Sequence, residues 1–274
     1  MAKGESIEVS LITATFNSAK NLADCLQSVA DQDYPNIEHI VIDGGSSDGT
    51  MEIVKSFPTV SRYISEPDKG IYDALNKGIK LATGDVIGFV HSDDMLAGKD
   101  IVSKIVECFE HHLPPPSSGY SSSMRRRNEK VEGVYGNLVF VDPDDTNKAV
   151  RYWISTPFDR NQVKHGWMPP HPTLFLHRKV YKKHGLFDIS FKIAGDYDFL
   201  LRALRDESIN LVLLPETIVK MRKGGASTGN FRELIRKKQE DLRAMRNNGF
   251  SFPLWVLIMK NVRKLPQLWK NSNK

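Results

Sequence analysis

The sequence predicts an α/β fold in which helices cover both faces of a parallel sheet. From the N-terminus to residue 110, apolar segments of strand length alternate with amphipathic segments of helix length. The strand segments are apolar along their whole length, as in parallel strands that are buried on both faces. The 274 residues suffice for one large core, and 40% hydrophobic with 26% charged residues is ordinary for a soluble globular protein.

The first half of the chain contains four strand signals and three helix signals. In the third helix, Ile71, Leu75 and Ile79 recur at helical spacing and are expected to face the sheet. A Pro- and Ser-rich segment at 113–130 is expected to form a flexible insertion loop. In chain order, the strands are 8–16, 37–44, 60–66 and 85–90, and the helices are 21–32, a segment from Thr50 onward, and 70–84.

The second half mixes strand and helix signals. Pro266 is expected to end or kink the final helix. These signals divide the chain into an α/β domain, residues 1–230, and a helical extension, residues 231–274. The predicted strands are 131–142 and 209–215, and the predicted helices are 194–204, 230–247 and 252–265.

The C-terminal part of the chain is basic. Residues 222–274 hold 13 Lys and Arg against three acidic residues, or +10, and the preceding residues hold 25 against 30, or −5. In the last helix, Leu254, Trp255 and Ile258 share one face, and Lys260 is expected to point elsewhere. This pattern predicts a helix that lies on an anionic membrane surface. The alternatives are a solvated basic face and an apolar face that packs on the protein or on a second subunit.

Cysteine content and the N-terminal sequence indicate the cellular compartment of the protein. Two cysteines, Cys25 and Cys108, suit a reducing environment and exclude a disulfide framework or a cysteine-based zinc site. Neither a signal peptide nor an uninterrupted apolar span of ~18 residues is present in the sequence. We therefore expect a cytoplasmic protein.

Polar residues cluster where the predicted strands of the first half end. Ligands of open α/β sheets bind at the carboxyl ends of the strands. This edge of the sheet is therefore the predicted binding site. The clusters are Thr13 to Asn17, Asp43 to Asp48, Glu66 to Lys69 and His91 to Asp94.

Asp93 and Asp94 end the sequence VHSDD, directly after the strand at 85–90. Two carboxylates at a buried strand end repel each other and lose their hydration. A divalent cation would remove that cost, and oxygen ligands suit Mg²⁺ or Mn²⁺ better than zinc. The alternative is that Ser92, Asp93 and Asp94 cap a helix that begins at this point. Spacing alone favours neither.

The glycine-rich sequence VIDGGSSDGT could bring backbone amides close to an anion. It is not G-x-G-x-x-G, because Ser46 occupies the second glycine position counted from Gly44, and no P-loop motif occurs in the chain. Asp43, at the strand tip, could accept hydrogen bonds from a nucleobase or ribose, or it could only shape a turn.

The first turns of two predicted helices contain further candidate site residues. Lys69, Tyr72 and Asn76 are predicted to share a face that could hold a diphosphate, although a solvated face has the same pattern. Asp196 and Asp198 open the helix at 194–204. One of the two could be a general base, or both could be first-turn acids that interact with the helix dipole.

Taken together, these segments resemble the family 2 glycosyltransferases, which are inverting enzymes of the GT-A fold. The resemblance implies a Rossmann-like, mostly parallel central sheet flanked by helices, to which this chain adds its C-terminal extension. It covers most of residues 7–230 and rests on SLITATFN, SVADQDYPNIEHIVIDGGSSDGT, SEPDKGIYDALNKGIKLATGDVIGFVHSDD, HPTLFLHRKVYKKHGLFD, AGDYDFLLR and GGAS, in the order of the family.

The resemblance implies roles for single residues. Asp94 would ligate Mg²⁺ or Mn²⁺ at the donor diphosphate, and Asp93 would lie near the ribose. Asp196 matches the general base of the family's Glu-Asp motif, but Gly195 replaces the Glu, whose supporting role could pass to Asp198. Further donor contacts would come from Thr13, Thr15, Asn17, Asp43, Asp68, Lys69 and Asn76, and His171 would line the sugar or acceptor pocket.

The resemblance also implies the reaction and its partners. A sugar would pass from a UDP-, GDP- or dTDP-linked donor to a saccharide or polyprenyl-linked acceptor, in bacterial surface polysaccharide or lipopolysaccharide assembly. Many members carry a second Asp where this chain has Gly44, so the nucleotide base is not specified by this motif. We expect a peripheral protein at the inner face of the cytoplasmic membrane, with no nucleic-acid partner.

Two rival functions share the fold class. A sugar-nucleotide nucleotidyltransferase would be expected to carry a Gly-rich N-terminal loop with a basic end, which ITATFNSAK does not provide. A catalytically silent sugar-nucleotide or nucleic-acid binding protein would have no reason to keep Asp93, Asp94 and Asp196 together. Both are less consistent with the sequence than a glycosyltransferase.

Overall fold

The computed structural model describes residues 6–111, 130–224 and 231–263. Apart from Lys130, the predicted insertion at 113–130 lies outside these residues, as does the GGAS segment beyond Gly224. The final residues of the predicted extension, 264–274, also lie outside them.

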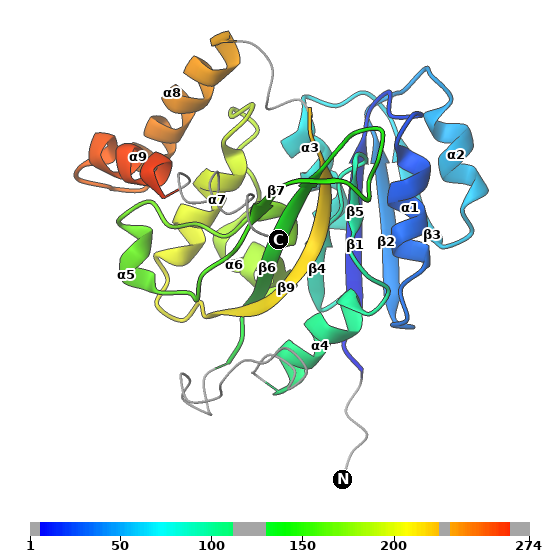
Figure 1. The fold of residues 1–274 in the computed structure, drawn as a ribbon, viewed down its shortest axis with the longest axis horizontal. Helices are drawn as coiled ribbons and strands as arrows, with labels where there is room; N and C mark the ends of the chain where they lie inside the picture. The colour runs from blue at the N-terminus through cyan, green and yellow to red at the C-terminus, as the bar shows by residue number, and fades with distance from the viewer. Residues whose placement is uncertain (1–5, 112–129, 225–230, 264–274) are drawn as a thin grey trace.

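The described residues form an α/β structure with one large sheet (Figure 1). The strands are β1 (Val9–Thr15), β2 (Ile37–Asp43), β3 (Val60–Ser65), β4 (Val86–Phe89), β5 (Asp94–Leu96), β6 (Gly133–Val141), β7 (Ala149–Trp153), β8 (Phe175–His177) and β9 (Leu211–Arg222). The α-helices are α1 (Leu22–Ala30), α2 (Thr50–Ser56), α3 (Ile71–Leu81), α4 (Ile101–His111), α5 (Arg160–Val163), α6 (Arg178–His184), α7 (Gly195–Leu204), α8 (Phe231–Asn247) and α9 (Pro253–Val262).

The sheet has the strand order β3-β2-β1-β4-β8-β6-β9-β5, with β7 paired to β6 outside that path. Its first four strands are all parallel, and every residue of β1 is buried. This burial on both faces explains the continuous apolar runs of the sequence. The antiparallel pairs all involve β5, β7 or β8, while β6 and β9 are parallel. The predicted Rossmann-like sheet flanked by helices is confirmed.

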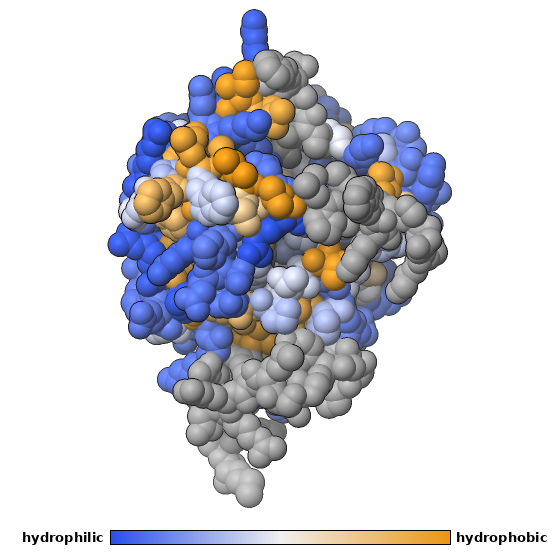
Figure 2. All heavy atoms as spheres, turned by 60° about the vertical axis from the view of Figure 1, so that its left-hand side comes forward, coloured by the Kyte–Doolittle hydropathy of each residue, from blue (hydrophilic) through white to orange (hydrophobic). Residues whose placement is uncertain are grey.

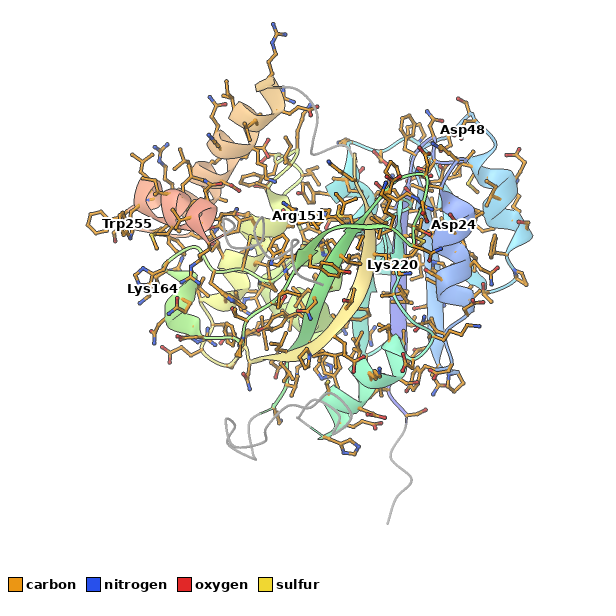
Figure 3. The ribbon with its side chains drawn as sticks, in the orientation of Figure 1. Asp24, Asp48, Arg151, Lys164, Lys220 and Trp255 are labelled. Carbon is orange, nitrogen blue, oxygen red and sulfur yellow. The ribbon has the colours of Figure 1, made fainter. Side chains whose placement is uncertain are left out.

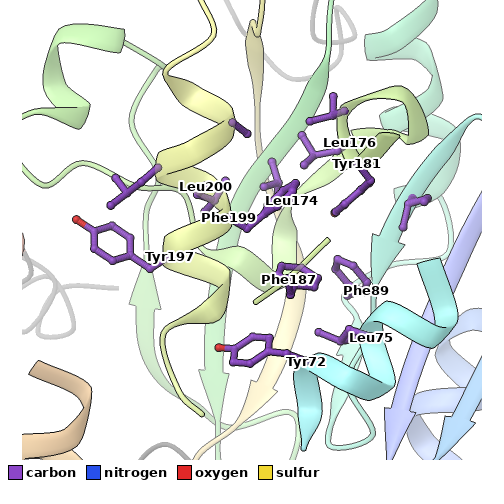
Figure 4. Close-up of a cluster of buried hydrophobic side chains, with 14 of the residues drawn as sticks. Tyr72, Leu75, Phe89, Leu174, Leu176, Tyr181, Phe187, Tyr197, Phe199 and Leu200 are labelled. Atoms are coloured by element: carbon purple, nitrogen blue, oxygen red, sulfur yellow. The ribbon is translucent and has the colours of Figure 1, made fainter. Parts of the chain in front are cut away.

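Two hydrophobic cores lie on opposite faces of the sheet. Successive residues of β1 alternate between them: Leu11 packs in the cluster that includes α1 and α4, and Ile12 packs in the cluster that includes α3 and α7. Figure 4 shows part of the second cluster, where Tyr72 and Phe187 lie between α3 and α7. A Cβ at Gly78 would lie 2.4 Å from Ile12 Cγ2, so the glycine permits the close approach of α3 to the sheet.

The β9 strand is longer than the predicted strand at 209–215. It continues to Arg222 because its second half gains a partner on each side, β6 and β5. The short strand β5 was not predicted, and it pairs Asp94 with Met221. This pairing brings the end of the parallel half of the sheet next to the end of β9.

The C-terminal helices pack on the α/β body, with α8 against α7 and α9 against α8 (Figure 1). As expected, Lys260 points to a different side of α9 from Leu254, Trp255 and Ile258, and that side faces the body. Lys260 is 5% exposed, its Nζ lies 2.9 Å from Asp241 Oδ1, and it sits 3.4 Å from the ring centroid of Tyr197. A paired carboxylate and an aromatic ring offset the cost of burying the ammonium.

The opposite side of α9 is apolar and exposed. Trp255 and Ile258 are each 55% exposed, and Trp255 points away from the body (Figure 3). Figure 2 shows apolar side chains gathered on the face of the molecule where the C-terminal helices lie. We call this surface the apolar face of α9; its residues are Phe252, Leu254, Trp255, Ile258 and Val262.

Lys260→Met is expected to lower the free energy of unfolding by about 3 kcal/mol, because it leaves the buried Asp241 carboxylate without its partner. The double variant Lys260→Met/Asp241→Leu removes both charges and should recover most of that loss. Urea unfolding of the two variants and the parent measures the difference. Equal stability of the single and double variants would contradict the pairing.

Candidate functional site

The carboxyl ends of β1, β2 and β4 meet at one edge of the sheet, where the predicted polar clusters lie. Parallel pairing places Thr15 opposite Asp43 at the ends of β1 and β2. Beyond the strands, the loops are tied together: Asn17 Oδ1 accepts from the Ser47 amide at 3.0 Å, and the Ser46 hydroxyl oxygen accepts from the Asn17 amide at 2.7 Å. These bonds hold the two loops in one arrangement beside the predicted site.

The side chains of Asp43 and Thr13 form hydrogen bonds inside the protein, which corrects the donor contacts implied for them. The carboxylate of Asp43 is buried and accepts hydrogen bonds from the amides of Gly45 and Ser46 and from the Ser46 hydroxyl. Asp43 therefore shapes the turn after β2, one of its two predicted alternatives. Thr13 is fully buried, with its hydroxyl 3.0 Å from His39 Nε2. Neither side chain reaches the surface.

Asp68 stands where a second aspartate of the β2 loop would lie. A Cβ at Gly44 would be 2.6 Å from Asp68 Oδ2, so a larger residue at position 44 would displace this carboxylate. The side chain of Lys69 is exposed, and the buried Thr15 hydroxyl has no hydrogen-bond partner among the described residues. Asp68, Lys69 and Thr15 are therefore still candidates for ligand contacts.

Asn76 does not face the site, which corrects the donor contact implied for it. Its Nδ2 donates to the carbonyl of Phe187 at 2.9 Å, and its Oδ1 accepts from the Phe187 amide at 3.0 Å. Tyr72 is buried as well, whereas Ile71, predicted to face the sheet, is 39% exposed. Tyr72 and Asn76, two residues of the predicted polar face, thus point into the protein. Asn76 does so because the buried backbone of Phe187 needs hydrogen-bond partners there.

The Asp94 carboxylate is fully buried, and neither of its oxygens has a hydrogen-bond partner among the described residues. Burial and then the charge of Asp93 raise the pKa of Asp94 well above its ordinary value, and Arg222 opposes that shift. The alternative of a helix cap is wrong, because Asp94 begins β5 and the next helix begins at Ile101. The structure therefore contains a buried carboxylate that lacks a charge partner in direct contact.

Arg222 was not singled out in the sequence. Its side chain is 5% exposed, forms an ion pair with Asp24 of α1, and donates through Nη1 to the carbonyl of Asp93 at 3.3 Å. Asp24 and Asp48 mark this side of the molecule in Figure 3. No motif points to Arg222, because its role depends on the pairing of β5 with β9. It brings a cation to the edge that holds Asp93 and Asp94.

Asp196 lies in the first turn of α7 and is partly exposed. The single O–H of Tyr72 is shared between two acceptors, the carbonyl of Ile193 at 2.7 Å and Asp196 Oδ1 at 3.2 Å. A Cβ at Gly195 would lie 2.9 Å from the ring of Tyr72, so the ring occupies the space that the Glu of the family motif would need. Tyr72 therefore takes the place beside Asp196 that the sequence left open.

Asp198 turns away from Asp196. It is buried, accepts from Asn248 Nδ2 at 2.9 Å, and lies 3.7 Å from the guanidinium of Arg202. Burial raises the pKa of Asp198, although Arg202 and Asn248 oppose the shift. The expectation that Asp198 supports Asp196 or lines the acceptor pocket is therefore wrong: its carboxylate joins α7 to the end of α8.

Two neighbouring histidines lie near Asp93 and Asp196. His171 is 9% exposed, neither ring nitrogen has a hydrogen-bond partner among the described residues, and its ring centroid lies 6.4 Å from that of His91. Burial and then His171 lower the pKa of His91 to about 4, while Asp93 and Asp196 act in the opposite direction. Burial also lowers the pKa of His171, with Asp196 opposing. Both rings therefore interact electrostatically with Asp196, and His91 also interacts with Asp93.

Relatives of this chain are found among glycosyltransferases. The glycosyl transferase family 2 model matches residues 10–185. An uncharacterized glycosyltransferase of Mycobacterium tuberculosis is 37% identical over 198 residues, which cover 71% of this chain and 68% of that protein. The PGL/p-HBAD biosynthesis glycosyltransferase of Mycobacterium bovis is 26% identical over 204 residues, which cover 73% of this chain and 71% of that protein.

Solved structures share the fold. S. aureus TarS in complex with UDP-GlcNAc superposes with a TM-score of 0.63 at 18% identity, over 95% of this chain and 73% of that one. The mannosyltransferase PcManGT from Pyrobaculum calidifontis, in complex with GDP-Man and Mn²⁺, superposes with a TM-score of 0.62 at 18% identity, over 97% of this chain and 72% of that one. These similarities confirm the GT-A fold. The chain is a glycosyltransferase, and it belongs to glycosyl transferase family 2.

Proposed function

We propose that this chain transfers a sugar from a nucleotide-diphospho-sugar to a hydroxyl group, with inversion at the anomeric carbon. The observation that carries the proposal is a pair of carboxyl groups in different environments: Asp94 is buried without a hydrogen-bond partner among the described residues, and Asp196 is partly exposed. His91 is within electrostatic reach of both Asp93 and Asp196. The similar structures bound to UDP-GlcNAc and GDP-Man support a nucleotide-sugar donor.

Asp196 is the proposed general base. It has one protein hydrogen-bond donor, Tyr72, and an exposed part that an acceptor hydroxyl could approach. Removal of the hydroxyl proton would make the oxygen a better nucleophile for the anomeric carbon. The neighbouring carboxylate of Asp198 is held by Asn248. Near the base, this leaves no second carboxylate on α7 to act as a nucleophile, which supports a single inverting displacement.

A divalent cation is part of the proposal. Among the described residues, no group of three or more His, Cys, Asp or Glu side chains could hold a metal. One buried carboxylate without a partner, Asp94, instead fits an ion such as Mg²⁺ or Mn²⁺ that takes its other ligands from phosphate oxygens and water. When bound, the ion would neutralise charge on the departing diphosphate. Arg222 adds a fixed positive charge beside Asp93.

The remaining donor contacts are proposed from residues that the fold leaves available. Thr15 and Asn17 lie at the end of β1 and would face the nucleoside, and Asp68 would read the base in place of the absent second aspartate. Lys69 would approach the diphosphate. His171, buried with two unpartnered nitrogens, would line the sugar pocket as a hydrogen-bond donor and acceptor.

Asp196→Asn is expected to lower kcat about 10²- to 10⁴-fold, because the amide cannot accept the acceptor proton, while donor affinity stays within about twofold. Steady-state transfer assays and calorimetric titration with UDP and GDP measure the two effects. Asp198→Asn, two residues further along the same helix, is the matched control and should keep its kcat. Normal turnover of Asp196→Asn, or equal loss in both variants, would sink the assignment of the base.

Asp94→Asn is expected to weaken Mn²⁺ binding at least about tenfold in the presence of UDP or GDP, because it removes the anionic ligand. Without metal, the same variant should be as stable as the parent or more stable, since a buried carboxyl is replaced by a neutral group of similar shape. Mn²⁺ titration and thermal unfolding provide the readouts, and Glu107→Gln on the exposed side of α4 is the control, which should bind Mn²⁺ like the parent. Unchanged Mn²⁺ affinity would show that Asp94 is not a ligand.

We further propose a lipid-linked saccharide acceptor and contact with an anionic membrane at its cytoplasmic face. The apolar face of α9 is exposed, and basic residues of α8 and Arg263 lie near it in the chain. Among the described helices, none is long and apolar enough to cross a bilayer. The exposed apolar face would lie in the membrane interface, and it would place the site beside a polyprenyl-linked substrate of surface polysaccharide or lipopolysaccharide assembly.

The variant Trp255→Ser/Ile258→Ser is expected to reduce binding to vesicles rich in phosphatidylglycerol at least about tenfold, because two large side chains no longer enter the interface. Co-sedimentation measures the bound fraction. Tyr63→Ser/Ile189→Ser removes two side chains of similar exposure far from α9 in the sequence and should bind like the parent. Identical partitioning of both variants would refute the membrane surface.

A further inference from the structure

Three consecutive backbone amides converge on one carboxylate of the C-terminal extension. Glu240 of α8 accepts hydrogen bonds from the amide of Lys192 at 3.1 Å, from that of Ile193 at 2.8 Å and from that of Ala194 at 3.0 Å. Successive amides that point to one place form an anion-binding concavity. Here the protein fills this concavity with its own side chain, which comes from an element far along the chain.

The segment that Glu240 holds leads directly into the catalytic helix. Ala194 precedes α7, and Asp196 is the second residue of that helix. The first amides of a helix have no partner inside the helix. Ala194 is the N-cap of α7, and Lys192 and Ile193 precede the helix, so charge-assisted hydrogen bonds to these three amides hold the peptide segment from which the first turn starts.

Tyr72 holds the same segment from the opposite side. Its hydroxyl donates to the carbonyl of Ile193, whose amide is bound by Glu240, and also to Asp196 itself. One peptide segment is thus held by α3 through its carbonyl and by α8 through its amides. Tyr72 belongs to the α/β domain, whereas Glu240 belongs to the extension, beyond residues 10–185 that match the family model.

We propose that Glu240 is a positioning residue for Asp196, so that the C-terminal extension completes the catalytic site rather than only attaching to it. The inference rests on the proposed function, in which Asp196 is the general base. Misplacement of a reacting group by about 1 Å can cost about 10²-fold in rate. Loss of the three hydrogen bonds is therefore expected to appear in the chemical step and not in the affinity for the donor.

A purely structural role predicts something else. The extension has other attachments to the same body: Arg243 Nη2 donates to the Ser190 hydroxyl at 2.5 Å and its guanidinium lies 4.4 Å from the ring centroid of Phe191, and Asn248 bonds Asp198. If Glu240 only fastened α8, its loss would resemble the loss of Arg243. Arg243 holds the loop before the segment through Asp188, Ser190 and Phe191, so it provides the matched comparison.

The test compares Glu240→Ala, Glu240→Gln and Arg243→Gln in the full chain, with kcat, donor KM and thermal unfolding measured for each. Glu240→Ala is expected to lower kcat about 10- to 100-fold with donor KM within about twofold. Glu240→Gln keeps one acceptor oxygen and should lose about 3- to 10-fold. Arg243→Gln should keep its kcat within about twofold even where it lowers the unfolding temperature as much.

The outcomes separate the positioning role from the function on which it rests. Asp196→Asn without activity, together with normal kcat in Glu240→Ala, would overturn the positioning role and leave the base in place. Equal loss of kcat in Arg243→Gln and Glu240→Ala would also overturn it, in favour of general attachment. Activity in Asp196→Asn would remove the base and the positioning role together. Should Glu240→Ala fail to fold, the split between kcat and KM in Glu240→Gln decides.

Discussion

The buried carboxylate of Asp94 is the constraint around which the site is built. A carboxylate removed from water without hydrogen bonds is costly in any protein. The β5–β9 ladder nevertheless holds Asp94 opposite Met221, one residue before Arg222, and Arg222 is itself buried against Asp24. The parallel half of the sheet thus supplies the anion, and the far end of β9 supplies a cation nearby. A bound divalent ion is the simplest group that would complete this arrangement.

The site spans both halves of the molecule and the extension. Asp93 and Asp94 follow β4, Asp196 lies in the first turn of α7, and His91 interacts electrostatically with both Asp93 and Asp196. The segment before Asp196 is hydrogen-bonded by α3 and by α8 at once. Because α9 packs on α8 and exposes its apolar face, the surface proposed for the membrane and the support proposed for the base belong to neighbouring helices.

Expectations failed where a polar residue was taken to be available to a ligand. Asn76 and Asp43 have the residue types of a donor site, yet both satisfy backbone groups inside the protein. Lys260 points away from the apolar face of α9 as expected, but its burial with Asp241 was not predicted. In each instance the partner is distant in sequence or is a backbone group, so no local pattern announces it. Hydrophobic periodicity likewise predicted that Ile71 faces the core, but Ile71 is exposed and Tyr72 is buried.

The sequence by itself determined the α/β class, the order of its main elements and the edge of the sheet where the site lies, because apolar periodicity and strand-end polarity are local properties. It also singled out Asp93, Asp94, Asp196 and His171. Only the tertiary structure decided which polar side chains form hydrogen bonds inside the fold, that Arg222 reaches Asp93, and that Glu240 reaches the segment before Asp196. These depend on strand pairing and helix packing between residues far apart in the chain, which spacing along the sequence does not encode.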